Sequence, residues 1–381
     1  MKIYYIANAR MPTEKAHGIQ LAKMCEAFIE QGIDLELVVP DRKTDADSLR
    51  DYYGLRVDVP LVKLPCVDWY GRGHFGFFVG SLTFAVSYFF YIRNRRKPGD
   101  LIYTTDIDQF SFFLIPFLGL PYVAEIHDAK PKGLLFGIFF RRAVGIVAIN
   151  NIIRKKLIER FKIPNERIIV HPNAIDMSSY QHVSSQEDAR ALLGIPFGIW
   201  VILYVGKFYS WKGLAVVAKA VPLLEKGTVV YLVGGRSDEF MRLTVLSSIP
   251  PGLVCIGHRD FKEIPNWLAA ADCLLLLGTR ENEYSFLHTS PMKVFEYMAS
   301  QRPIIASRTP ANEEIVSSEE VFFYEPDNAA ELAAKIHYVG SHPAEAREKA
   351  ARAQEKVKGF TWEKRAKDIV EFISKNLESG I

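Results

Sequence analysis

Short apolar runs alternate along the chain with longer segments in which apolar residues recur at helical spacing. Residues 3–7 form the first apolar run, a loop carrying Gly18 follows, and apolar positions then recur every three or four residues up to Gly32. A second apolar run, residues 35–39, ends at Pro40. The pattern predicts a βαβ unit with parallel strands and a right-handed crossover.

The alternation continues and then restarts after a polar stretch at about residues 180–195. Strands are expected at residues 101–105, 122–126, 146–149 and 168–170, and again at 200–205, 229–233, 254–256, 273–277 and 304–306. We therefore predict an α/β protein of two doubly wound, Rossmann-like domains that face each other. The domains are assigned to residues 1–185 and 186–361, and a final helix, residues 362–381, has an apolar face to bury against the first domain.

Composition and charge narrow the class of protein. Hydrophobic residues make up 49% and charged residues 24% of the 381, as in ordinary soluble proteins, and a net charge of +3 is too small to indicate nucleic-acid binding. The four cysteines lie far apart in apolar surroundings, which favours buried free thiols over disulfides or zinc ligands. Because Met1-Lys2 leads directly into the first apolar run, no signal peptide is expected, and we predict a cytoplasmic protein.

Residues 75–92 contain no charged side chain, and Arg93-Asn94-Arg95-Arg96-Lys97 follows at once. Three interpretations stay open: a buried or half-buried helix of the first domain, a helix at a membrane interface with a cationic flank, or a transmembrane helix of minimal length. Apolar runs at residues 110–120 and 134–140, the latter followed by Arg141-Arg142, add to the interface interpretation. A possible partner is therefore an anionic membrane, contacted peripherally.

Two acidic motifs follow strands of the first half. Asp106-Ile107-Asp108 has the form of a metal-binding signature, but loop capping and turn formation are the simpler interpretation. Glu125-Ile126-His127-Asp128 lies where the strand at residues 122–126 ends. Because ligands bind at the carboxyl ends of strands in open α/β sheets, His127 is a candidate site residue, against the alternative of a structural histidine.

The stretch from Ser290 to Ala299 predicts a helix that begins at an anion. Ser290 suits the N-cap and Pro291 the first turn. Such a helix start aims free N–H groups and the positive end of the helix dipole at an anion, most naturally a phosphate. Glu296 lies between one and two turns further on, where its carboxylate can accept hydrogen bonds from a ribose diol. Together these features predict a nucleotide-sugar site.

Two lysines lie on the loop after the first strand of the second half. Gly206-Lys207 follows the strand, and Lys212 comes five residues later, just before a helix. In that position their ammonium groups can neutralise a diphosphate leaving group. Lysines are also common on solvated loops, so the pair gains its weight from Ser290 and Glu296 in the same domain.

In this order the motifs resemble those of the large retaining, GT-B-type glycosyltransferase family 4. The resemblance covers nearly the whole chain and rests on the Gly18 loop, Glu125-x-His127-Asp128, Pro172-Asn173-x-x-Asp176, Gly206-Lys207 with Lys212-Gly213, and Ser290-Pro291-x-Lys293-x-x-Glu296. It implies two Rossmann-like domains with an interdomain cleft and a C-terminal helix that crosses back to the first domain. It also implies a nucleoside-diphosphate sugar bound by the second domain, with no metal or other cofactor.

The resemblance further implies roles for particular residues. The catalytic groups would be His127, which would contact the donor sugar near the reacting carbon, and Lys207 and Lys212, which would bind the diphosphate. The residues that would bind the donor are Gly18, Gly206, Arg259, Thr289, Ser290, Pro291, Met292 and Glu296. Among these, Glu296 would bind the ribose, the backbone of residues 289–292 the phosphates or the sugar, and Arg259 would lie near the base.

One position departs from the family pattern. The family commonly has two glutamates separated by seven residues; the second matches Glu296, but His288 occupies the first position. Because the first carboxylate binds the donor sugar in the family, the identity and orientation of that sugar stay open. Glu281 or Glu283 is an alternative carboxylate, although both also fit a flexible acidic loop.

The predicted function is transfer of a sugar from a nucleoside-diphosphate sugar to an acceptor hydroxyl on a glycan, a glycolipid or a lipid-linked sugar, with retention of anomeric configuration. Two rival functions stay open. A non-hydrolysing sugar-nucleotide epimerase would share the architecture and act on the donor alone. A non-catalytic nucleotide-sugar-binding protein would fit the histidine at position 288.

Overall fold

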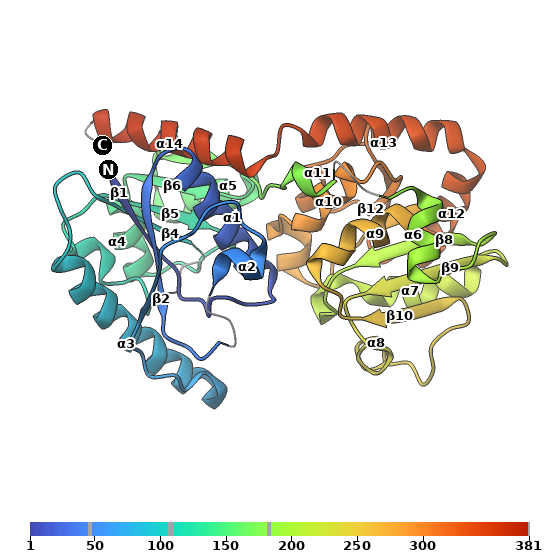
Figure 1. Cartoon of the computed structure of the whole chain (residues 1–381), viewed down its shortest axis with the longest axis horizontal. Helices are drawn as coiled ribbons and strands as arrows, with labels where there is room; N and C mark the ends of the chain where they lie inside the picture. The colour runs from blue at the N-terminus through green and yellow to red at the C-terminus, as the bar shows by residue number, and fades with distance from the viewer. Residues whose placement is uncertain (45–47, 106–107, 109, 181–183, 380–381) are drawn as a thin grey trace. The chain divides into compact units, whose positions relative to one another are not determined.

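The structure is a computed structural model that describes residues 1–44, 48–105, 108, 110–180 and 184–379. The chain divides into two compact units, which we call unit 1 (Met1–Asn173 with Trp362–Ile381) and unit 2 (Ala174–Thr361; Figure 1). The division precedes the expected boundary at residue 185. Ile175 already belongs to unit 2, because its side chain packs into the core of that unit and its N–H donates to the carbonyl of Phe360 at 2.9 Å.

Unit 1 is built on a seven-stranded parallel sheet with the spatial order β3-β2-β1-β4-β5-β6-β7. Its strands are β1 (Lys2–Ile6), β2 (Asp34–Pro40), β3 (Leu61–Leu64), β4 (Leu101–Thr105), β5 (Tyr122–Ile126), β6 (Gly145–Ala148) and β7 (Ile168–Val170). Strands are added toward one edge of the sheet from β1 to β3 and toward the other edge from β4 to β7, so the order reverses between β1 and β4. Such a reversal leaves a crevice at the carboxyl ends of the two strands, where ligands bind in doubly wound folds.

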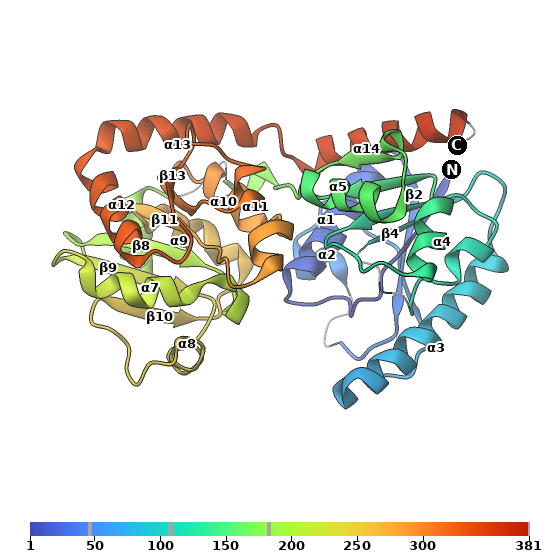
Figure 2. The same ribbon diagram turned by 180° about the vertical axis from the view of Figure 1, so that it is seen from behind.

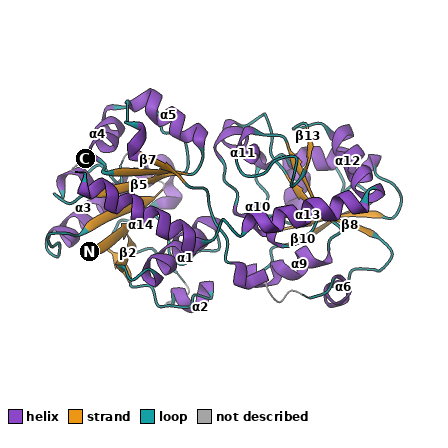
Figure 3. Ribbon diagram, turned by 90° about the horizontal axis from the view of Figure 1, so that it is seen from above, coloured by secondary structure: helices purple, strands orange, loops and turns teal. Residues whose placement is uncertain are grey.

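Helices cover both faces of this sheet (Figures 1 and 2). The helices of unit 1 are α1 (Ala16–Glu30), α2 (Leu49–Tyr53), α3 (Gly73–Arg93), α4 (Leu134–Arg142), α5 (Asn151–Phe161) and α14 (Trp362–Glu378). Helices α3, α4 and α5 share one apolar core with the sheet. On the other face, Phe28 of α1 packs edge-on against Tyr5 and Tyr103. Helix α14 lies beside α1 (Figure 3), so the last helix of the chain is part of unit 1.

Helix α3 contains the uncharged segment of the sequence. Seven of its residues are buried, and Phe84, Ala85, Tyr88 and Ile92 are among those that pack into the core of unit 1. Its other side leaves Phe75 66% and Phe90 58% exposed. Among the described helices it alone has the length and apolar composition needed to cross a membrane. One helix thus combines an inward core face with an outward aromatic face.

Unit 2 repeats the doubly wound plan with six parallel strands in the order β10-β9-β8-β11-β12-β13. Its strands are β8 (Trp200–Val205), β9 (Thr228–Val233), β10 (Leu253–Gly257), β11 (Cys273–Leu276), β12 (Ile304–Ser307) and β13 (Phe322–Tyr324). Its helices are α6 (Gln186–Leu193), α7 (Leu214–Ala220), α8 (Ser237–Thr244), α9 (Ile264–Ala270), α10 (Met292–Ala299), α11 (Pro310–Glu313), α12 (Ala329–Ser341) and α13 (Pro343–Val357). One core joins the sheet to α6, α9, α10 and the end of α13, and a second joins it to α7, α8 and α12. The crevice expected from this order lies between β8 and β11.

The predicted strands are present with bounds that differ by a residue or two, but β3 and β13 were not predicted. Both are short strands at an edge of their sheet, so each pairs with a single neighbour and needs only a brief apolar run.

The four cysteines differ in burial according to their place in the sheets. Cys25 and Cys273 are buried as predicted, whereas Cys66 and Cys255 are half-buried, because Cys66 follows edge strand β3 and Cys255 lies in edge strand β10.

Candidate functional site

The candidate site of unit 2 lies at the carboxyl ends of β8 and β11. Gly206 and Lys207 follow β8, and Gly278 follows β11. The two loops pack closely, since a Cβ atom at Gly213 would lie 3.1 Å from the carbonyl oxygen of Gly278. These loops therefore enclose the crevice at which doubly wound sheets bind their ligands.

Helix α10 points its first turn at the same place, but it begins later than predicted. The helix starts at Met292, and Pro291, not Ser290, is the N-cap residue, with an extended ψ of 126°. Because proline has no N–H, Pro291 cannot contribute a backbone donor to an anion, which corrects part of its expected role. The helix is fixed to the sheet by Tyr297, whose hydroxyl accepts a hydrogen bond of 2.8 Å from the N–H of Val205 at the end of β8.

Lys293, to which the sequence motif gave no role, lies at the centre of the site. A Cβ atom at Gly206 would lie 2.6 Å from Nζ of Lys293, so the ammonium group packs directly over the β8 loop. The same Nζ lies 3.8 Å from the centre of the Tyr204 ring, and Nζ of Lys212 lies 3.9 Å from that of Trp211. Aromatic faces attract both ammonium groups without neutralising them.

The ionisable groups of this site are perturbed by burial. Burial lowers the pKa of Lys212 to about 8. Burial, helped by the charge of Lys212, lowers the pKa of Lys293 well below its ordinary value. Burial raises the pKa of Glu296 to about 7, although the charge of Lys293 opposes the rise. None of the three makes an ion pair within 4.0 Å in the described part of the chain, although the charges of Lys293 and Glu296 act on each other. Ionisable groups perturbed in this way are typical of functional sites.

Two glycines let the backbone approach this cluster. Gly206 has a φ of +142° and Gly234, after β9, a φ of +120°, which side chains rarely adopt. A Cβ atom at Gly234 would lie 2.6 Å from the carbonyl carbon of Gly206. The Gly206-Lys207 loop is therefore packed between Gly234 and Lys293, and its conformation requires glycine.

The remaining residues predicted in unit 2 surround the cluster unequally. Lys207 is exposed, Thr289 and Ser290 are buried before α10, and Met292 opens that helix. Arg259 lies beyond the carboxyl end of β10, where its Nε is 3.8 Å from Glu263. His288 is buried at the end of a five-residue π-helical turn, Tyr284–His288, and its Nε2 is 3.8 Å from Oε1 of Glu283. The position where the family has a glutamate therefore holds an imidazole beside a carboxylate.

Gly18 was predicted in a loop, but it lies in the first turn of α1 in unit 1. A Cβ atom there would lie 2.4 Å from the hydroxyl of Tyr53 and 2.6 Å from Cγ2 of Thr13. The N–H of Thr13 donates to that hydroxyl at 2.7 Å. Close packing of α1 on these two residues explains the glycine without reference to a ligand.

His127, also in unit 1, lies just beyond the carboxyl end of β5. Its Nε2 is 2.6 Å from Oε1 of Glu125, and its side chain is 15% exposed.

Of the acidic pair after β4, residue 106 lies outside the described residues. Asp108 accepts hydrogen bonds from the N–H groups of Phe110 and Ser111 at 2.8 Å. Asp108 therefore caps a turn.

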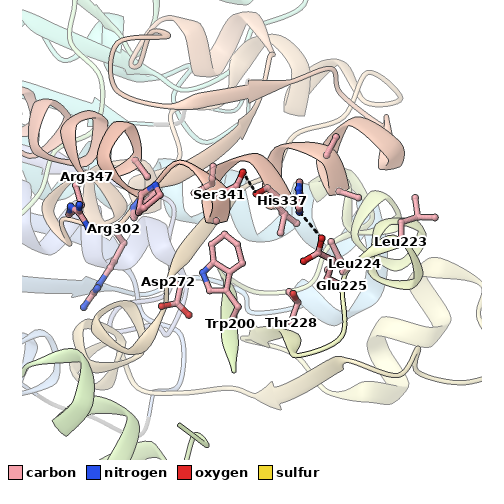
Figure 4. A pocket seen from close by; sticks show the side chains of 18 of the residues that line it. Trp200, Leu223, Leu224, Glu225, Thr228, Asp272, Arg302, His337, Ser341 and Arg347 are labelled. Carbon is pink, nitrogen blue, oxygen red and sulfur yellow. Dashed lines mark hydrogen bonds and ion pairs between the residues drawn. The ribbon is translucent and has the colours of Figure 1, made fainter. Parts of the chain in front are cut away.

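A cavity of about 920 Å³ lies in unit 2, but at the opposite end of the sheet. Figure 4 shows Trp200 and Thr228, at the first residues of β8 and β9, facing His337 and Ser341 of α12. Within it, Nδ1 of His337 is 2.8 Å from Oε1 of Glu225. None of the predicted site residues lines this cavity, so we assign the candidate site to the carboxyl ends of β8 and β11.

Two family models match the chain, Glycosyltransferase Family 4 over residues 18–179 and glycosyl transferases group 1 over residues 200–342. A curated relative is TuaC of Bacillus subtilis (strain 168), named as a glycosyltransferase of teichuronic acid biosynthesis, which is 24% identical over 226 residues. The alignment covers 57% of this chain and 54% of TuaC, so the chain spans about half the length of the relative it matches.

Several solved structures share the fold along the whole chain. The glycosyltransferase from Rickettsia africae ESF-5 has a TM-score of 0.74 and 17% identity, with 99% of both chains covered. Sucrose-phosphate synthase from Thermosynechococcus elongatus (TM-score 0.75, 16% identity) and Anabaena Alr3699/HepE in complex with UDP-glucose (TM-score 0.72, 19% identity) are matched over 100% of both chains. The two units together have the two Rossmann-like sheets of the GT-B fold, and each part of the chain is similar to a glycosyltransferase family, Family 4 in the N-terminal part and group 1 in the C-terminal part.

Proposed function

We propose that the chain transfers a sugar from a nucleoside-diphosphate sugar to an acceptor hydroxyl, with retention at the anomeric carbon. The observation that carries the proposal is the cluster of Lys212, Lys293 and Glu296 at the carboxyl edge of the unit 2 sheet. Two ammonium groups fit a diphosphate, and a carboxylate one turn into α10 fits the ribose beside it. The Alr3699/HepE structures, which contain UDP and UDP-glucose, support a nucleotide-sugar donor. Retention follows the resemblance to family 4.

The proposed reaction breaks the bond between the anomeric carbon and the diphosphate oxygen, and the electron pair leaves with the diphosphate. A new bond forms between the anomeric carbon and the acceptor oxygen, and the departing phosphate oxygen takes the proton of the acceptor hydroxyl. Negative charge thus develops on the leaving group, where Lys207, Lys212 and Lys293 stabilise it. His127 contacts the reacting sugar. No step of this scheme uses a metal or another cofactor.

The donor assignment predicts ligand-dependent thermal stability. A ligand that binds only the folded protein raises the melting temperature, and at 100 times its dissociation constant it adds about 2.7 kcal/mol to the free energy of unfolding. We expect one nucleoside diphosphate, and its sugars, to raise the melting temperature in the absence of added metal. The Glu296→Ala variant should lose most of that rise, whereas Glu355→Ala, an exposed carboxylate on α13, should keep it. Equal stabilisation of all three proteins, or of none by any nucleotide, would contradict the donor site.

We further propose that the protein works in the cytoplasm, at the inner face of the cytoplasmic membrane, on a glycan, glycolipid or lipid-linked acceptor. The support is the outward face of α3, where Phe75, Phe78, Val86 and Phe90 are exposed. Arg93 and Arg95 are exposed where this helix ends. Aromatic side chains beside arginines fit the interface of an anionic bilayer.

Membrane contact predicts binding to vesicles that contain an anionic phospholipid, at low salt, and weaker binding at high salt. Phe90→Glu should weaken the binding by about 10- to 100-fold, because one buried aromatic ring contributes about 1.5–3 kcal/mol. Phe197→Glu, at a site of similar exposure in unit 2, is the matched control and should bind as the wild type does. Binding that is insensitive to Phe90→Glu, or equal on neutral vesicles, would argue against this surface.

A further inference from the structure

Glu125 is a fully buried carboxylate with five polar contacts. Its Oε1 atom accepts a hydrogen bond of 2.8 Å from Gln20, lies 2.6 Å from Nε2 of His127 and lies 2.9 Å from a guanidinium nitrogen of Arg365. Its Oε2 atom accepts hydrogen bonds from the Tyr103 hydroxyl and, at 3.2 Å, from the second guanidinium nitrogen of Arg365. Gln20, Tyr103 and one guanidinium nitrogen of Arg365 donate to the carboxylate, and the other guanidinium nitrogen adds an ion pair, so the site is built around an anion.

Arg365 comes from α14, 240 residues further along the chain, and is as fully buried as Glu125. Besides its two contacts with Glu125, its Nε donates to the carbonyl of Pro172 at 2.9 Å. A guanidinium held at three atoms has a fixed orientation, and a bidentate contact transmits that orientation to the carboxylate. The last helix of the chain therefore determines where the Glu125 carboxylate lies.

The ionisation state of Glu125 determines which nitrogen of His127 carries a hydrogen. Burial alone would raise the pKa of Glu125, but the Arg365 guanidinium and the hydrogen bond from His127 hold it well below its ordinary value. An ionised carboxylate only accepts hydrogen bonds, so Nε2 of His127 must be the donor. In the neutral imidazole, Nδ1 is then the atom with the free electron pair. Within the described part of the chain, Nδ1 has no hydrogen-bond partner.

We propose that Glu125 is a positioning residue for His127 and that Arg365 holds Glu125 in place. The carboxylate fixes the tautomer with hydrogen on Nε2, so that Nδ1 accepts a hydrogen bond from a hydroxyl group of the donor sugar. The tautomer follows from unit 1 alone, and only the last step rests on the proposed function. A helix at the far end of the chain thereby sets the geometry of a site residue after β5.

A second buried ion pair of unit 1 provides a matched control. Nζ of Lys23 lies 2.9 Å from Oε2 of Glu26, and both side chains are at most 9% exposed. Both residues lie on α1, and the pair has no contact with His127. Its removal tests what the loss of a buried ion pair does to the unit without a change at the imidazole.

The test is nitrogen-15 NMR of histidine-labelled full-length protein, recorded at a pH at which the His127 signals are those of a neutral imidazole. His127 is identified by comparison with His127→Ala. We expect Nε2 of His127 to carry the proton and Nδ1 to be unprotonated. The Nε2 proton should exchange slowly with solvent, because it is hydrogen-bonded. The double variant Glu125→Met with Arg365→Met removes both charges, which keeps the core neutral and folded. It should lose the slow exchange, and the variant Lys23→Met with Glu26→Met should keep it.

Turnover provides the second readout, measured as nucleoside diphosphate released from the nucleotide sugar that stabilises the protein. Loss of a carboxylate that orients a histidine costs about 10- to 100-fold in comparable metal sites. We expect a fall of that size for the Glu125 and Arg365 double variant, and no further fall when it is made in the His127→Ala protein. An unprotonated Nε2 in the wild type would overturn the proposal. An equal fall in turnover in the wild-type and the His127→Ala proteins would overturn it as well. The expected spectra without turnover of any nucleotide sugar would uphold the positioning and overturn the proposed function instead.

Discussion

Lys212→Ala should lower turnover by about 100- to 1000-fold, the usual cost of removing one group that stabilises charge in a transition state. The ammonium group of Lys212 is half-buried beside the Trp211 ring at the carboxyl edge of the unit 2 sheet. Charge grows on the departing diphosphate during the reaction, so the loss should appear mainly in kcat and less in KM. The measurement is the initial rate of nucleoside diphosphate release at saturating donor.

Lys219→Ala is the matched control, because Lys219 is exposed on α7, a short distance further along the chain. It should leave kcat and KM within about twofold of the wild-type values, as surface substitutions away from a site usually do. If Lys212→Ala retained full kcat, stabilisation of the leaving group by this lysine would be excluded.

The same lysine predicts how donor affinity depends on pH. The pKa of Lys212 is about 8 without ligand, and a bound diphosphate favours the protonated form, so its pKa is higher in the complex. By linkage, the contribution of Lys212 to donor affinity is constant below about pH 8. Above that pH the affinity falls by about tenfold per pH unit, until the pH reaches the pKa of Lys212 in the complex. Lys212→Arg should remove the part of the decline that Lys212 causes, because a guanidinium stays protonated throughout. Calorimetric titration with the nucleoside diphosphate measures both slopes.

Arg365→Met should cost about 3–5 kcal/mol of the stability of unit 1, because it leaves the Glu125 carboxylate buried without its counterion. Arg365 and Glu125 are each 0% exposed, so solvent does not screen the loss. Hydrogen exchange of the amides in β5 and α14 reports the free energy of opening this unit separately from unit 2. Their protection factors should fall accordingly.

The neighbouring residue on α14 provides the control. Lys364 pairs with Asp368 at 2.9 Å, but its side chain is 53% exposed, and exposed pairs contribute about 0–1 kcal/mol. Lys364→Met should therefore change exchange little. Combining Arg365→Met with Glu125→Met should recover most of the loss, because an apolar pair replaces two buried charges. A double variant as unstable as Arg365→Met alone would show that shape, not charge, dominates here.

Local patterns in the sequence are sufficient to predict the doubly wound plan and the strand ends at which ligands are expected. Apolar runs of strand length, separated by helical periodicities, fix the order of elements, because each element must bury an apolar face. Residues after the strands, such as Lys207 and His127, are then placed at the carboxyl edge of a sheet by topology alone. Short edge strands such as β3 were not predicted, because a strand with a single pairing partner needs only a brief apolar run. The first residue of α10 was also predicted wrongly, because one capping residue leaves only a weak local pattern.

Which side chains contact one another could not be predicted from local patterns and is seen in the folded chain. Lys293 lies within the predicted motif, yet its packing over Gly206 depends on how α10 docks beside β8. Arg365 lies on the same face of α14 as buried apolar residues, where periodicity alone predicts no charge. Its partner Glu125 is 240 residues away in the sequence. Local periodicity shows which face of a helix is buried. Which residue a side chain on that face contacts depends on long-range packing and on the need to neutralise a buried charge.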